Sequence, residues 1–145
     1  MDKELIELQT EYLKGLPEKI DQIYELSIDL EKKKNLTQSL TLLKGIIHSI
    51  KGSAGSYEIN FLSNLCHKFE DHINSFELGK SDISKFFLFI DLMREYLEFF
   101  DPSGVNDDSD FINKLDLLTT VDPSSKTSDK KANLSRKVLG ISFDK

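Results

Sequence analysis

Apolar residues recur at helical spacing through most of residues 5–100, and no other feature of the sequence constrains the fold as strongly. Five segments carry apolar side chains three or four positions apart, so each can bury one face as a helix. These segments begin near residues 5, 17, 36, 59 and 83. The alternation of apolar and polar residues that would indicate a β-strand is not found in this region. The pattern predicts an all-α protein.

Glycine, proline and asparagine mark where the predicted helices begin and end. Gly15 predicts the end of a short first helix, and Pro17 fits the first turn of a second. Asn35 and Gln38 predict a capping box at the start of the third helix. Because short connections favour antiparallel neighbours, we expect helices two to five to form an antiparallel up-and-down four-helix bundle. The additional N-terminal helix would pack across this bundle.

The composition changes after about residue 105 and divides the chain into three predicted parts. Residues 1–104 are expected to form the helical bundle, 105–121 a short extra helix, and 122–145 a flexible linker or tail. Residues 122–145 hold six basic and three acidic residues, whereas residues 1–121 hold thirteen and twenty-two. Residues 137–144 have the pattern of one β-strand, which is not stable alone in water. One interpretation is therefore that the chain is the front part of a longer protein.

The charge balance and the single cysteine exclude several classes of function. The formal net charge is −6 and the isoelectric point is near 5.1, whereas proteins that bind nucleic acid need a basic surface. Cys66 has no second cysteine for an internal disulfide, and the N-terminus lacks the pattern of a secretory signal. No apolar run approaches the roughly 20 residues that span a bilayer. We expect a cytoplasmic, monomeric protein that binds neither nucleic acid nor membrane.

The predicted third helix carries the residues with the clearest chemical potential. Its apolar stripe, which Leu42 and Ile46 widen on one side, defines the face turned to the core. One flank away from this stripe carries Lys44, Gly45, His48, Lys51, Gly52 and Gly55. Each exposed glycine weakens a helix by about 1 kcal/mol relative to alanine, so three on one flank need a reason.

A functional interpretation and a plainer one both fit this flank. In the first, the glycines leave a bare docking face around His48, and Lys44 and Lys51 place ammonium groups where phosphate oxygens would lie. In the second, Gly52 and Gly55 mark a frayed helix end, His48 is an ordinary boundary residue, and the lysines are solvated. Composition and periodicity do not decide between the two interpretations.

Two motifs favour the functional interpretation. Residues 48–57, HSIKGSAGSY, resemble the signature of histidine-containing phosphotransfer (HPt) domains, and residues 65–71, LCHKFED, look like the next helix of one subfamily. That subfamily is the phosphoryl-accepting N-terminal domain of chemotaxis (CheA-like) histidine kinases, and the resemblance covers roughly residues 5–100. It implies that His48 is phosphorylated, Lys51 is its charge partner and Glu70 accepts a hydrogen bond from the imidazole. His67 would join this network.

The resemblance implies a phosphoryl carrier rather than an enzyme. A histidine kinase catalytic domain would phosphorylate His48 on Nε2, and an aspartate of a response-regulator receiver would take the group. A carboxylate that holds the Nδ1 proton leaves the Nε2 lone pair free as the nucleophile. No cofactor or metal is expected in this chain, and the Mg²⁺ of the transfer would be bound by the receiver. The family commonly has a glycine a few residues after the histidine helix, where this sequence has Glu58-Ile59-Asn60.

Two other functions stay open on the sequence. The first is a helical module that docks a receiver without being phosphorylated. The second is a metal-binding bundle that uses His48, His67 and Glu70, although the known carboxylate-bridged bundles have more acids and paired histidines.

Overall fold

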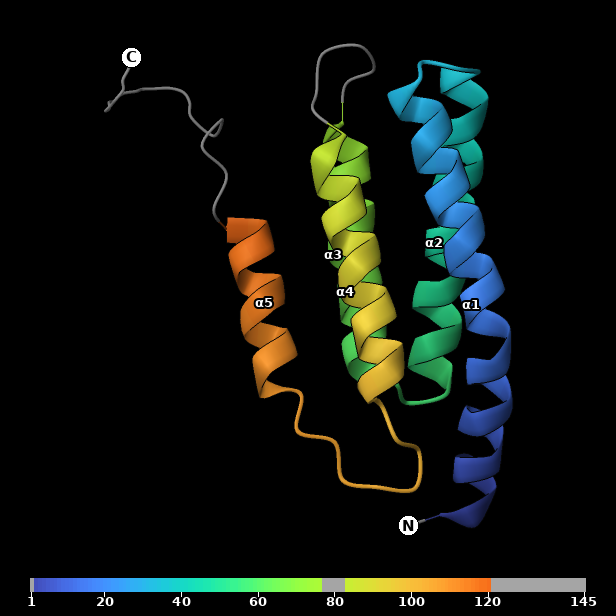
Figure 1. Cartoon of the computed structure of the whole chain (residues 1–145). Helices are drawn as coiled ribbons and strands as arrows, with labels where there is room; N and C mark the ends of the chain where they lie inside the picture. The colour runs from blue at the N-terminus through green and yellow to red at the C-terminus, as the bar shows by residue number, and fades with distance from the viewer. Residues whose placement is uncertain (1, 77–82, 121–145) are drawn as a thin grey trace. The chain divides into compact units, whose positions relative to one another are not determined.

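The computed structural model describes residues 2–76 and 83–120 of the 145. The predicted tail at 122–145 and its strand at 137–144 lie outside the described residues. Within those ranges the regular structure is helical, and none of the helices is long and apolar enough to cross a membrane. Figure 1 shows the helices in order: α1 (Lys3–Glu31), α2 (Leu36–Ser56), α3 (Asn60–Ser75), α4 (Ser84–Phe99) and α5 (Ser109–Thr120).

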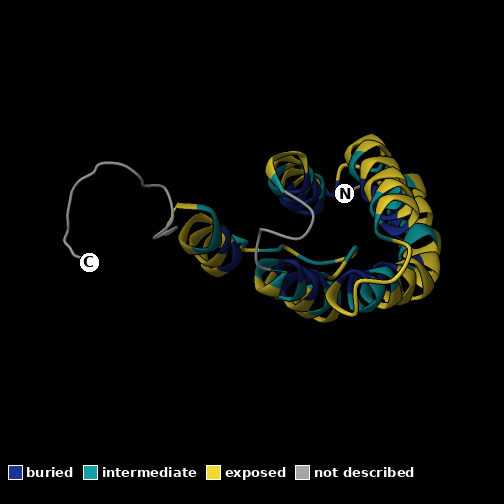
Figure 2. Cartoon of the chain, turned by 90° about the horizontal axis from the view of Figure 1, so that it is seen from above, coloured by how far each residue is buried: buried dark blue, intermediate teal, exposed yellow. Residues whose placement is uncertain are grey.

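Helices α1 to α4 form an antiparallel four-helix bundle. Each of them contacts two of the others, in the order α1, α2, α3, α4 and back to α1. Seen from above, their buried sides face one another and their exposed sides face outward (Figure 2). The all-α bundle that the periodicity predicts is therefore confirmed. Its core is rich in aromatic rings at the contact of α3 and α4, where Phe69 stacks on Phe89 with ring centroids 4.7 Å apart.

The two helices predicted on either side of Gly15 are a single helix, α1, which runs through Pro17 for 29 residues. The prediction of a separate N-terminal helix packed across the bundle was wrong. Proline removes one backbone hydrogen bond from a helix interior, but residues on both sides of it are held by the bundle. Leu16 and Ile20 are buried after the predicted break, and Gln9 before it donates to the Tyr57 carbonyl oxygen at 2.8 Å. Tertiary contacts therefore outweigh the local helix-breaking signal.

The turn before α2 also differs from its prediction. Asn35 does precede the first residue of α2, but its backbone is left-handed, with φ 45° and ψ 51°, and its side chain makes no capping hydrogen bond. A residue whose side chain caps a helix typically has an extended backbone. The predicted capping box with Gln38 was therefore wrong. The main-chain oxygen of Asn35 accepts the first hydrogen bond of the helix, from the Ser39 amide, at 2.8 Å.

The turn between α2 and α3 sets how the site helices meet. Glu58 has φ 61°, the Glu58 amide donates to the Gly55 carbonyl at 3.1 Å, and the Ile59 amide donates to the Ala54 carbonyl at 2.9 Å. These two bonds are those of a Schellman motif, which normally places glycine at the left-handed position. Glu58 therefore adopts a left-handed backbone conformation that normally favours glycine. The buried side chains of Ile59 and Ala54 complete the motif.

The first half of α5 belongs to the same compact unit as the bundle, which comprises residues 1–115. Phe111 and Leu115 are buried, and the Phe111 ring lies 5.1 Å from the Tyr96 ring and 5.8 Å from the Phe61 ring. The Tyr96 hydroxyl donates to Asp108 at 3.0 Å, just before α5 begins. An aromatic cluster thus covers one end of α3 and α4.

Candidate functional site

His48 projects from the outer flank of α2. The neighbouring Ile47 and Ile50 are fully buried, whereas the His48 side chain is 68% exposed. Its Nδ1 atom lies 2.9 Å from Oε2 of Glu70 on α3. The hydrogen bond that the resemblance implies between these residues is therefore present, and it is made by Nδ1 and not by Nε2.

Glu70 receives donors from two residues of α2. The Lys51 ammonium lies 2.6 Å from Oε1, and the Glu70 side chain is only 15% exposed. The hydrogen bond from Lys51 lowers the pKa of Glu70, burial opposes this shift, and the hydrogen bond from His48 lowers it further. An ionised carboxylate can only accept hydrogen bonds, so the proton of this contact belongs to Nδ1 of His48. In the tautomer with its proton on Nδ1, the imidazole has its lone pair on Nε2.

Two of the three glycines of α2 lie in open space. A Cβ atom added at Gly45 or Gly52, three residues before and four residues after His48, would meet nothing within 4 Å. Internal packing therefore does not require glycine at either position. Gly55 differs, because a Cβ there would lie 3.3 Å from the Ser63 hydroxyl of α3. Lys44 is exposed one turn before His48.

His67 is placed apart from the other predicted site residues. Its Nε2 atom lies 3.6 Å from the Asp71 carboxylate one turn further along α3, and both side chains are exposed. The structure therefore pairs His67 with Asp71. His67 is not part of the hydrogen bonds that join Glu70 to His48 and Lys51. Such a pair at i and i+4 is a surface interaction of a few tenths of a kcal/mol.

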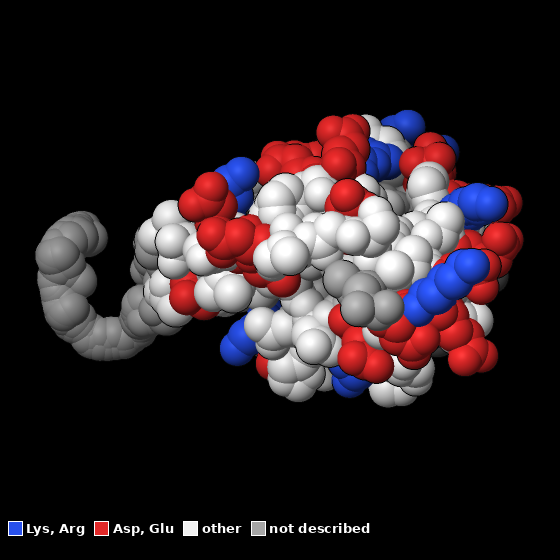
Figure 3. Space-filling model, turned by 90° about the horizontal axis from the view of Figure 1, so that it is seen from below, with Lys and Arg blue, Asp and Glu red and all other residues white. Residues whose placement is uncertain are grey.

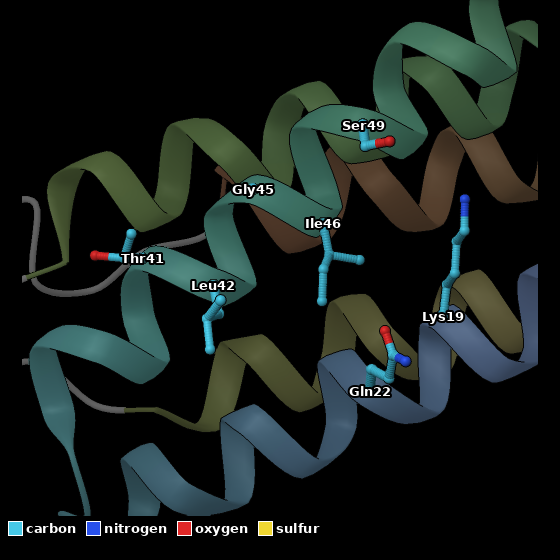
Figure 4. Close-up of a pocket in the computed structure, with 7 residues that line it drawn as sticks. All are labelled: Lys19, Gln22, Thr41, Leu42, Gly45, Ile46 and Ser49. Atoms are coloured by element: carbon cyan, nitrogen blue, oxygen red, sulfur yellow. The ribbon is translucent and has the colours of Figure 1, made fainter.

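An open groove of about 340 Å³ lies between α1 and α2, and Gly45 is among the residues that line it (Figure 4). Leu42 is 50% exposed on the α2 side. The sequence did not predict this groove, because the groove forms only where two helices lie side by side. The one sign of it in the sequence was that Leu42 and Ile46 widen the apolar stripe. The lining residues are Lys19 and Gln22 from α1, and Thr41, Leu42, Gly45, Ile46 and Ser49 from α2.

The described residues do not assemble a recognisable metal centre. Within 2–76 and 83–120, no group of three or more histidine, cysteine, aspartate and glutamate side chains is arranged to hold a metal ion. Cys66 is buried, and burial raises the pKa of its thiol to about 12. A thiol protonated at neutral pH is neither a nucleophile nor a metal ligand.

The fold and the site together define a helical bundle that presents an exposed histidine, His48, whose Nδ1 atom is bound to a carboxylate of the neighbouring helix. A comparison with protein families matches residues 7–99 with the Hpt domain, which spans α1 to α4 and ends where α4 ends. No curated protein and no solved structure matches the chain. Because the family match covers more than half of the sequence, the chain belongs to the Hpt domain family. Hpt domains are histidine phosphotransfer modules of two-component signalling, phosphocarriers that are distinct from ATP-binding catalytic domains.

Proposed function

We propose that this chain is a phosphorelay intermediate in which Nε2 of His48 carries the phosphoryl group. The observation that carries this proposal is the 2.9 Å contact of Nδ1 with Glu70 on an imidazole that is 68% exposed. The Nε2 lone pair attacks the γ-phosphorus of ATP bound to a separate histidine kinase catalytic domain. An N–P bond forms, and the bond from phosphorus to the oxygen of the departing ADP breaks. The chain itself needs no cofactor.

The onward step reverses this chemistry at a different partner. A carboxylate oxygen of a response-regulator aspartate attacks the phosphorus, the O–P bond forms, and the N–P electron pair returns to Nε2. The receiver supplies the Mg²⁺ that neutralises the phosphoryl oxygens. Throughout both steps the Nδ1 proton of His48 stays on the ring, where the Glu70 carboxylate binds it.

Glu70 and the two lysines have separate electrostatic roles in this proposal. The imidazole gains positive charge as the N–P bond forms, and the carboxylate of Glu70 stabilises that charge. Lys51 keeps Glu70 ionised through its 2.6 Å hydrogen bond. Lys44, one turn before His48, is placed on the outer flank to attract the phosphoryl oxygens. Positioning and charge account for most of the catalysis in phosphoryl transfer.

Partners approach across the bare outward surface of α2. Gly45 and Gly52 leave open space on one side of His48, and the groove between α1 and α2 continues from Gly45. A receiver that covers this surface can contact the exposed apolar side chain of Leu42 while its aspartate reaches Nε2. The docking face therefore comprises Lys44, Gly45, Gly52 and the groove, whereas Gly55 lies beside α3.

The family resemblance supports a more specific setting for this function. The paired motifs at residues 48–57 and 65–71 favour a chemotaxis-type histidine kinase, of which this chain would be the N-terminal module. In that setting the protein works in the cytoplasm as a monomeric module, and its kinase domain lies elsewhere. The pairing of His67 with Asp71 gives His67 no direct part in the transfer.

The test is acid-labile, base-stable labelling by a histidine kinase catalytic domain supplied with labelled ATP. Label is expected on the wild-type chain and is expected to be absent from His48→Gln, whose circular dichroism should match that of the wild type. An unlabelled wild-type chain with several active kinases would instead favour a module that docks a receiver without phosphorylation.

A further inference from the structure

Helix α3 binds both the side chain and the main chain of Lys51 of α2. The Glu70 carboxylate binds the Lys51 ammonium at 2.6 Å, and the Ser63 hydroxyl donates to the Lys51 main-chain oxygen at 2.8 Å. A main-chain oxygen inside a helix already accepts the amide four residues later, which here is the amide of Gly55. The Ser63 bond is therefore an additional bond between two helices.

Gly55 makes room for this bond. A Cβ atom at residue 55 would lie 3.3 Å from the Ser63 hydroxyl oxygen, a separation tighter than ordinary van der Waals contact. The same atom at Gly45 or Gly52 would meet open space. Of these three glycines, Gly55 is thus the one whose missing side chain serves the packing of α2 against α3.

Ser63 and Glu70 join α3 to the same residue of α2. Ser63 and Glu70 are seven residues apart, so they lie about two turns apart on the same face of α3. Both contact Lys51, and His48 lies one turn before Lys51 on α2. The hydrogen bond from the Ser63 hydroxyl to a main-chain oxygen resists sliding of α3 along α2. The main-chain oxygen is fixed in the helix, whereas the Lys51 ammonium can move when the side chain changes rotamer. This hydrogen bond therefore limits how far the Glu70 carboxylate can shift along α2 relative to the His48 ring.

We infer that Ser63, accommodated by Gly55, is a positioning residue that sets the Glu70 carboxylate against Nδ1 of His48. This inference rests on the proposed function of His48, and it adds a residue that neither motif of the sequence points to. Ser63 acts through the register of two helices and touches no reacting atom.

The experiment measures the tautomer of the His48 ring and, separately, its phosphorylation in the absence of a protein partner. Nitrogen NMR of the folded chain reports the fraction of neutral His48 that is protonated on Nδ1. Phosphoramidate, a small phosphoryl donor, reports the reactivity of the imidazole: Nε2 attacks phosphorus, the N–P bond to the ring forms, and ammonia leaves. Because phosphoramidate needs no docking face, its rate separates positioning from partner recognition.

Ser63→Ala is expected to reduce the Nδ1-protonated fraction and to slow labelling of His48 about fivefold, the rate equivalent of one neutral hydrogen bond. Ser63→Thr keeps the hydroxyl and should restore both readouts. Gly55→Ala should slow labelling as Ser63→Ala does, and the double variant should be no slower than either single one, because both changes break one interaction.

Ser53→Ala is the matched control. The Ser53 hydroxyl also joins two helices, since it lies 2.6 Å from the Tyr12 hydroxyl of α1, but it is not in contact with α3 through this bond. Its loss should lower stability to a similar extent and leave the tautomer and the labelling rate of His48 unchanged.

A Ser63→Ala chain with the wild-type tautomer and rate would overturn the inference and leave the proposed function intact. Equal changes in Ser63→Ala and Ser53→Ala would also overturn it, because they would reflect general loosening of the bundle. Failure of the kinase to label the wild-type chain would count against the proposed function, while the NMR comparison would still decide the role of Ser63.

Discussion

At the scale of single residues, the Glu70 carboxylate binds both the Lys51 ammonium and the His48 imidazole. Its carboxylate accepts from the Lys51 ammonium and from Nδ1 of His48, with separations of 2.6 and 2.9 Å. The neighbouring carboxylate of Asp71 is exposed and pairs with His67. Glu70 and Asp71 are therefore adjacent acids in different environments, and variants of the two can be compared directly.

Replacing Glu70 by alanine is expected to slow phosphorylation of His48 by roughly 10- to 100-fold. This range corresponds to losing one hydrogen bond to a charged group, which is worth about 1.5–3 kcal/mol. Initial rates of labelling by the kinase domain would measure the effect. Asp71→Ala, which removes the next carboxylate, should label at the wild-type rate, and equal losses in the two variants would contradict a specific role for Glu70.

At the scale of helices and turns, residues that are unfavourable locally lie where the chain reverses or where α2 faces outward. Glu58 occupies a left-handed position with φ 61°, and Lys33 does so in the preceding turn with φ 60°. A side chain with a Cβ atom in this conformation costs about 1 kcal/mol or more relative to glycine. Gly45 and Gly52 show the opposite mismatch, since they lie inside a helix that would be more stable with alanine.

Glu58→Gly is expected to stabilise the bundle by about 1 kcal/mol, because glycine adopts the left-handed position of a Schellman motif without a Cβ penalty. Urea unfolding followed by circular dichroism would measure the change. Glu18→Gly on the exposed side of α1 is the matched control, and it should destabilise by about the same amount. Destabilisation by Glu58→Gly would contradict the strain assigned to this turn.

Gly52→Ala is expected to raise stability by about 0.5–1 kcal/mol, since its Cβ would meet open space. If the bare surface of α2 receives partners, the same change should slow transfer to a receiver and leave labelling by phosphoramidate unchanged. Gly15→Ala provides the comparison, because residue 15 is also an open helical position but lies on α1. It should stabilise equally without slowing transfer, and unchanged transfer in Gly52→Ala would remove residue 52 from the docking face.

At the scale of the whole molecule, the bundle combines an aromatic core with an acidic surface. Residues 1–121 carry twenty-two acidic and thirteen basic side chains, and acidic groups outnumber basic ones on the face shown in Figure 3. Most of these charges are exposed and are screened by salt. Glu70 is an exception, because its side chain is only 15% exposed and its carboxylate is bound by two donors. Its protonation therefore affects the stability of the entire fold.

The stability contributed by Glu70 should depend on pH in a defined direction. Its pKa is lowered in the folded state, chiefly by the hydrogen bond from Lys51, so the folded chain binds this proton less readily than the unfolded chain. The contribution is fully present above the ordinary pKa of glutamate, about 4.3, and is lost as the pH falls through the lowered folded value.

Unfolding free energies of the wild type and of Glu70→Gln, measured between pH 7 and pH 3, would test this dependence. The wild type is expected to be the more stable at pH 7, and the difference should shrink below about pH 4 as the carboxyl becomes neutral. An advantage that stays constant across this range would show that the charge of Glu70 does not stabilise the fold.

The sequence by itself determined the helical class of this protein and which side of α2 around His48 faces the core. Periodicity is a local property of the chain, so the burial of Ile47 and Ile50 and the exposure of His48 could be predicted from spacing alone. The partnership of His48 with Glu70 was reached only through the resemblance of two motifs to a known family. Spacing within one helix carries no information about which residue of another helix lies opposite.

Only the tertiary structure decided how the helices combine. The continuity of α1 through Pro17, the groove between α1 and α2, and the bond from Ser63 to the Lys51 main chain all depend on contacts between residues far apart in the sequence. The same holds for His67, which shares a helix with Glu70 and still pairs with Asp71. Local preferences of about 1 kcal/mol per residue yield to the burial of several side chains at once, each of which contributes more.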